Sequence, residues 1–65
     1  MKVSKEQKQK TRKIIIETAV ELMTENGYQK TSMKKIAKGA GIGDATIYKY
    51  FPTKEKILLA YYEIK

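Results

Sequence analysis

Two short helical segments separated by only three residues are the feature that most constrains how this chain can fold. The apolar spacing predicts one helix over residues 32–40 and another over residues 44–50. They are joined by Gly41-Ile42-Gly43, and Gly41 tolerates the positive φ that a tight turn after a helix requires. A connection this short, with glycine at its first position, is typical of a helix-turn-helix unit.

The small and apolar residues around this turn fit the crossing of two helices. Ala37 is small where the helices must approach closely, and Ile47 is the apolar side chain that the second helix turns inward. We therefore place the helix-turn-helix at residues 32–51, with an ordinary helical hairpin as the open alternative. The predicted turn and core of the motif comprise Ile36, Ala37, Ala40, Gly41, Ile42, Ile47 and Phe51.

A longer helix is predicted before this motif. One apolar stripe indicates a helix from about Thr11 to Asn26, closed by the glycine that follows. Residues 1–10 are expected to form a basic flexible arm. Ser4 and Gln7 nevertheless resemble a capping box, which would start the helix earlier.

A fourth helix is predicted after the motif. Pro52 prevents the preceding helix from continuing, and Thr53 is placed to cap a new helix that starts at Lys54. Residues 54–65 are apolar on most of the helix circumference, so they should be buried on several sides. We expect that further protein follows this helix or that a partner covers it.

The composition excludes several classes of protein. A chain of 65 residues without cysteine or histidine has no disulfide, none of the usual zinc sites and no thiol or imidazole active site. No acidic pair suggests catalysis, so an enzyme is not expected. No aliphatic run comes near the roughly 20 residues that cross a bilayer. A cytoplasmic protein without a membrane segment or a cofactor of its own is therefore expected.

The net charge of +7 is concentrated in two blocks of the sequence. Residues 1–13 carry six bases and one acid, and residues 30–56 carry seven bases and two acids. Such blocks are typical of proteins that bind polyanions, although a solubilising surface explains the charge equally well.

The outward residues of the second motif helix favour nucleic acid. With Ile47 inward, this helix exposes short or hydrogen-bonding side chains suited to the major groove of DNA. Lysines that can bind DNA phosphates lie around this helix. The helices that start near Ser32 and Lys54 also offer free backbone N–H groups to phosphates. The exposed residues are expected to be Asp44, Ala45, Thr46, Tyr48 and Lys49, and the surrounding bases are Lys34, Lys35, Lys38 and Lys54.

With these features the sequence resembles a known family, the TetR/AcrR family of bacterial repressors. The resemblance covers about residues 11–60, and residues 47–55 are its most specific part. Its matching residues are Thr11-Arg12, Ile15, Ala19, Glu21-Leu22, Gly27-Tyr28, Thr31-Ser32-Met33, Ile36-Ala37, Ala40-Gly41-Ile42, Thr46-Ile47-Tyr48 and Tyr50-Phe51-Pro52-Thr53-Lys54-Glu55.

The resemblance implies an all-α, three-helix DNA-binding domain at residues 11–53. Residues 54–65 would start a helix that links it to a helical regulatory domain, which binds a small-molecule inducer and forms a homodimer. The expected partner is double-stranded DNA, with a palindromic operator.

The resemblance also implies roles for single residues. Tyr48 and Lys54 would contact phosphates, Thr46 and Lys49 would lie near the bases, and Phe51 and Tyr28 would pack. Either Thr31 or Ser32 would anchor the second helix, and a half-buried core position is the alternative for Tyr48. The predicted DNA-contacting set is Thr31, Ser32, Lys34, Gly43, Asp44, Ala45, Thr46, Tyr48, Lys49, Tyr50 and Lys54.

The start of the predicted recognition helix departs from the family pattern. Gly43 replaces a serine-like cap, and the acidic Asp44 follows it. The Asp44 carboxylate can cap the helix, or it can accept a hydrogen bond from the amino group of cytosine. A second hypothesis for the whole chain is a protein-interaction module that uses the apolar fourth helix.

Overall fold

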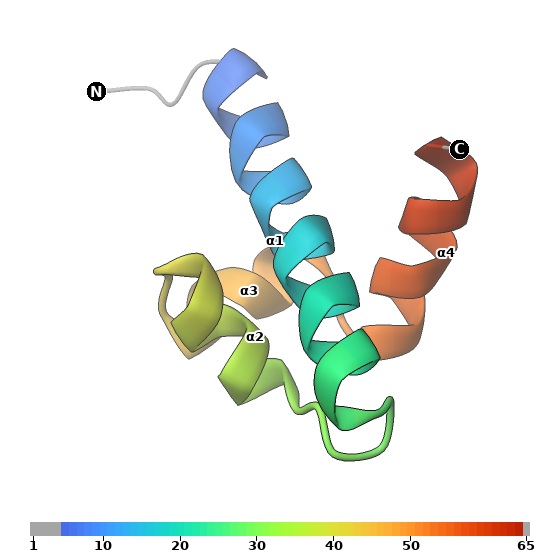
Figure 1. Cartoon of the computed structure of the whole chain (residues 1–65). Helices are drawn as coiled ribbons and strands as arrows, with labels where there is room; N and C mark the ends of the chain where they lie inside the picture. Colours follow the sequence, from blue (N-terminus) through green and yellow to red (C-terminus); the bar gives the residue numbers. More distant parts are fainter. Residues whose placement is uncertain (1–4, 65) are drawn as a thin grey trace.

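Four helices account for all the regular structure in residues 5–64, the part of the chain that the computed structural model describes. They are α1 (Lys5–Asn26), α2 (Met33–Ala40), α3 (Asp44–Tyr50) and α4 (Lys54–Ile64). Figure 1 shows α1 as the longest helix, with α2 and α3 on one side of it and α4 on the other. The predicted all-α architecture, with a fourth helix after the helix-turn-helix, is confirmed.

The first helix begins earlier than expected. The prediction of a flexible arm over residues 1–10 is wrong for residues 5–10, which form the first turns of α1. Residues 1–4, and with them the proposed Ser4 cap, lie outside the described residues. The physical reason is that lysine, glutamine and glutamate are good helix formers, so this segment extends α1 without an apolar stripe.

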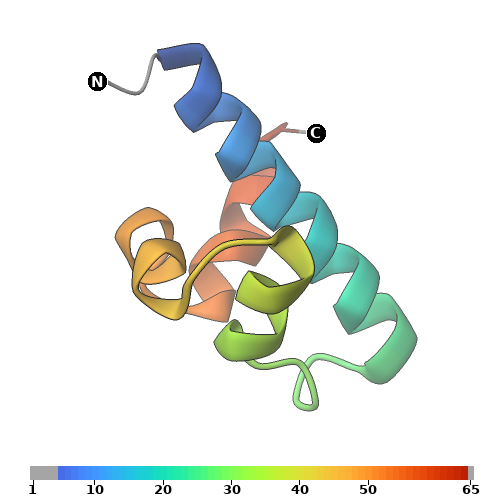
Figure 2. The same ribbon diagram turned by 90° about the vertical axis from the view of Figure 1, so that its left-hand side faces the viewer.

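The hydrophobic core lies where α1 meets the other helices. α1 packs against α2 on one side and against α4 on the other, while α3 packs on α2. Figure 2, seen from the side of α2 and α3, shows that α3 lies at the edge of the molecule. The buried apolar side chains are Ile15, Ile16, Ala19, Met33, Ile36, Ala37, Ile47, Phe51, Ile57 and Ala60.

The turn between α2 and α3 has the predicted geometry. Gly41 has a φ of 76°, in the left-handed region. The Gly41 N–H donates to the Lys38 carbonyl at 3.2 Å, and the Ile42 N–H donates to the Ala37 carbonyl at 2.9 Å. These bonds satisfy carbonyls that the end of α2 would otherwise leave without partners.

Side-chain hydroxyls cap two of the helices. The Ser32 hydroxyl accepts a hydrogen bond from the Lys35 N–H at 3.1 Å at the start of α2. The Thr53 hydroxyl accepts one from the Lys56 N–H at 3.3 Å at the start of α4. The predicted cap at Thr53 is therefore confirmed, and Ser32 rather than Thr31 caps α2.

Gly39 lies at a close approach between α1 and α2. A Cβ atom at this position would lie 2.8 Å from Cγ2 of Thr18. Glycine inside a helix costs about 1 kcal/mol relative to alanine. The structure gives the compensation, because glycine lets the two helices pack more closely than alanine would.

Candidate nucleic-acid interface

The exposed face of α3 is the centre of the candidate interface. Ile47 is completely buried against α2, which fixes the rotation of α3 about its axis. The prediction that this side of α3 faces outward is confirmed except at Thr46, which was expected to be exposed and is half-buried. The exposed side chains of α3 are Asp44, Ala45, Tyr48 and Lys49.

Tyr48 is one of the most exposed large hydrophobic side chains of the described residues, with 53% of its surface accessible. The alternative of a half-buried core position for this tyrosine is therefore wrong. Phe51, in contrast, is buried, as expected for a packing residue. Tyr50 is half-buried and packs at the edge of the core, so less of it is available to a ligand.

The N-terminal end of α3 has no side-chain cap. Gly43 is the N-cap residue, and its carbonyl accepts hydrogen bonds from the Thr46 and Ile47 N–H groups, both at 3.1 Å. Asp44 is the first residue of the helix, so the suggested capping role of its side chain is wrong. Its carboxylate is exposed in the first turn, where it complements the helix dipole.

The start of α2 lies beside this face and carries exposed bases. Ser32, Lys34 and Lys35 are all exposed, and Lys35 also donates to the Lys30 carbonyl at 3.4 Å. Free backbone N–H groups and lysines at a helix N-terminus are suited to binding phosphate.

Thr31 has to be removed from the predicted contact set. Its side chain is 1% exposed, and its hydroxyl donates to the Gly27 carbonyl at 2.9 Å. The Thr31 side chain therefore ties the end of the α1–α2 loop to its beginning. Its neighbour Ser32 is the residue that faces solvent at the start of α2.

Lys54 is held in place by a residue from a distant part of the chain. Its ammonium group donates to the Tyr28 carbonyl at 2.7 Å and lies 4.2 Å from the centre of the Tyr28 ring. This cation–π contact restricts where the charge can lie. Tyr28 was expected only to pack, and no sequence signal indicated that it contacts Lys54.

A recess of about 540 Å³ joins Lys54 to the exposed face of α3. Tyr48 contributes to its lining from α3, and Lys54 and Lys56 contribute from the first turn of α4. Two predicted phosphate contacts, Tyr48 and Lys54, are therefore brought to one hollow although they belong to different helices.

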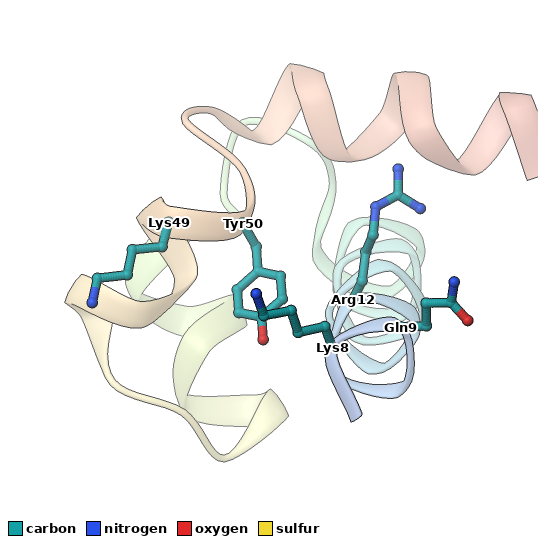
Figure 3. A pocket seen from close by; sticks show the side chains of 5 residues that line it. All are labelled: Lys8, Gln9, Arg12, Lys49 and Tyr50. Carbon is teal, nitrogen blue, oxygen red and sulfur yellow. The ribbon is translucent and has the colours of Figure 1, made fainter. Parts of the chain in front are cut away.

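A second hollow lies between α1 and α3 and was not predicted. Figure 3 shows the side chains that line it, which are Lys8, Gln9, Arg12, Lys49 and Tyr50. Arg12 also packs over the Phe51 ring, with its guanidinium carbon 5.4 Å from the ring centre. The prediction of a flexible arm gave no reason to expect this hollow, because Lys8 and Arg12 share one face only when residues 8–12 are helical.

The described residues show neither a metal site nor a membrane segment. Among residues 5–64 no group of three or more acidic side chains is close enough to hold a metal ion. In the same range, no helix combines the length and the hydropathy that crossing a membrane requires.

Comparison with known proteins agrees with this geometry. The family model described as bacterial regulatory proteins, tetR family, matches residues 15–61. The chain is 51% identical over 51 residues to the fatty acid metabolism regulator protein of Bacillus subtilis. This match covers 78% of this chain and 26% of that protein. It is 40% identical over 52 residues to the HTH-type transcriptional regulator UidR of Escherichia coli, covering 80% of this chain and 26% of UidR.

A solved structure shows the same arrangement of helices. Thermus thermophilus FadR, a TetR family transcriptional repressor crystallised in complex with lauroyl-CoA, matches with a TM-score of 0.74 and 40% sequence identity. The match covers 77% of this chain and 26% of FadR. The chain thus spans about a quarter of the length of these relatives.

Proposed function

Because the chain belongs to the tetR family of bacterial regulatory proteins, we propose that it binds double-stranded DNA sequence-specifically as part of a transcriptional repressor. The observation that carries this proposal is the exposed face of α3, which has bases from α2 and α4 around it. A helix presented in this way fits the major groove, with phosphate contacts on its flanks.

The positions of the side chains suggest a division of roles. Ser32, Tyr48 and Lys54 would contact phosphates, because they lie at helix N-termini or in the recess beside α3. Thr46 and Lys49 would lie near base edges, where hydroxyl and ammonium groups can read the donor and acceptor pattern.

The whole regulator is expected to act as a homodimer on a palindromic operator. We expect its small-molecule inducer to bind outside these 65 residues, in a helical regulatory domain. The length of the relatives supports this proposal, since each is about three times as long as this chain.

A salt titration on random-sequence duplex DNA tests the proposal. We expect dissociation constants of roughly 1–100 µM, rising steeply with salt as counterions are released. Lys54→Ala should weaken binding on all sequences and reduce the log–log salt slope by about one unit. Lys13→Ala removes the same charge from the exposed side of α1 and serves as the control. An unchanged slope in Lys54→Ala would exclude Lys54 from the phosphate contacts.

The second hypothesis, a protein-interaction module, is favoured by the exposed apolar side chains of α4. Leu59 is 48% exposed and Tyr62 is 65% exposed. Binding through such a surface would depend weakly on salt, so the same titration separates the two functions.

A further inference from the structure

The groove between α1 and α3 has the properties of a second anion-binding site. It is an open hollow of about 450 Å³, lined by Lys8, Gln9 and Arg12 from α1 and by Lys49 and Tyr50 from α3. Three of these five residues are bases and none is acidic. Excess positive charge in a concave surface attracts anions more strongly than the same charge on a convex surface.

The helical structure of residues 5–10 makes this site possible. Lys8 and Arg12 are four residues apart on α1, so a continuous helix places them on the same face. In a flexible arm these charges would be spread over many positions, and their fixation on contact with a ligand would cost entropy.

The groove and the recess at Lys54 open on different sides of α3. Tyr48 lines the recess, whereas Lys49 and Tyr50 line the groove, and each successive residue turns about 100° around a helix. A helix in the major groove has a phosphate backbone on either side of it. The recess at Lys54 would meet the phosphate backbone of one DNA strand, and the groove between α1 and α3 lies on the side of the other strand's backbone.

The geometry points to the groove between α1 and α3 as a phosphodiester-binding site of the DNA-binding surface, with Lys8 as its main cation. In Figure 3 the Lys8 side chain extends from α1 in the direction of Tyr50, whereas the side chains of Arg12 and Lys49 extend away from Tyr50. Lys8 is therefore the cation placed to reach a phosphate at the opening. Arg12 adds charge while it packs over Phe51. This inference rests on the proposed DNA binding and extends the interface from α2, α3 and α4 to α1.

Replacing Lys8 tests the inference with a matched control on the same helix. Lys8→Gln removes the charge from the groove. Lys10→Gln removes the same charge two residues away, about 200° around α1, from a residue that does not line the groove. Both side chains are exposed, so both variants should keep the helical circular dichroism spectrum and melting temperature of the parent.

The measurement is the salt dependence of binding to random-sequence duplex DNA. We expect Lys8→Gln to reduce the log–log slope by about 0.9, as for one lost phosphate contact, and Lys10→Gln to leave it at the parent value. Lys8→Arg should restore the slope, because it restores the charge. Equal slopes for Lys8→Gln and Lys10→Gln, with a parent that binds steeply, would overturn the groove site alone. A parent chain without salt-dependent binding would overturn the proposed function and this inference together.

Discussion

Glycine 39 shows how a residue that weakens a helix locally can be required by the packing. Glycine in a helix is about 1 kcal/mol less favourable than alanine, so its replacement would normally stabilise α2. Here an added Cβ would lie 2.8 Å from Cγ2 of Thr18. Threonine in a helix has only two common χ1 rotamers, so its methyl group has few ways to move aside.

We therefore expect Gly39→Ala to destabilise the parent protein, by up to about 2 kcal/mol after the gain in helix propensity is subtracted from the cost of overpacking. The double variant with Thr18→Ser lacks the obstructing methyl group. In that background the same glycine substitution should stabilise the protein by about 1 kcal/mol. Urea unfolding of the four proteins in this cycle measures the change of sign. Stabilisation by Gly39→Ala alone would show that α1 and α2 can separate without cost.

At the scale of single elements, α2 depends on the cap at its first turn. The Ser32 hydroxyl accepts the Lys35 N–H, and the same residue faces the proposed DNA. Ser32→Ala should lower the free energy of unfolding by about 1 kcal/mol. Ser32→Asp should preserve stability, because aspartate is as good a cap and complements the helix dipole.

The same two variants separate capping from DNA binding. A carboxylate at position 32 would repel phosphates, so Ser32→Asp should bind duplex DNA more weakly than the parent although it is equally stable. Urea unfolding checks the predicted stability, and a titration with duplex DNA at fixed salt checks the predicted loss of affinity. Binding by Ser32→Asp that equals the parent's would place the start of α2 away from the DNA.

In α3, the charge of Asp44 is expected to restrict which DNA the protein binds. Asp44→Asn removes the repulsion between this exposed carboxylate and phosphates, so affinity for random-sequence DNA should rise. If the carboxylate accepts from cytosine, discrimination at one base pair should fall by about 1–3 kcal/mol. Loss of the charge at the helix N-terminus should cost about 0.3–1 kcal/mol of stability.

Two titrations at fixed salt, on random duplex and on the best selected site, measure these effects of Asp44→Asn. Affinity for random duplex that stays at the parent value would mean that Asp44 points away from DNA. The orientation proposed for α3 in the major groove would then be wrong.

At the scale of the whole molecule, we expect the 65-residue chain to be largely monomeric at micromolar concentration. A stable interface buries about 800 Å² of each partner, which is roughly a sixth of the 5077 Å² surface of the described residues. Among the residues of α4 whose burial the structure describes, 54–63, the strongly exposed large apolar side chains are Leu59 and Tyr62. Sedimentation equilibrium checks this expectation, and a tight dimer would contradict it.

A monomeric chain should also bind a palindromic operator poorly. Two DNA-binding domains that read successive half-sites must lie about 34–36 Å apart, and a dimer scaffold normally sets this spacing. We expect affinity for a palindrome to exceed that for a single half-site only when the chain is joined to a dimerising domain.

The sequence alone determined the local features of this protein. Gly41 and Pro52 end their helices because of backbone restrictions that act within a few residues. Ile47 sets the orientation of α3 because helical periodicity puts one side of an amphipathic segment inward. The family followed from the same short-range patterns, since its most specific residues form one continuous segment.

Only the tertiary structure decided which distant residues meet. Lys54 bonds to Tyr28 across 26 positions, and Gly39 approaches Thr18 across two helices. The groove that Lys8 lines also requires the placement of α1 beside α3, since residues of both helices line it. The physical reason is that a sequence pattern repeats with the helical turn and says which side of a helix is buried. The crossing angles that bring two particular side chains together depend on how all the helices pack at once.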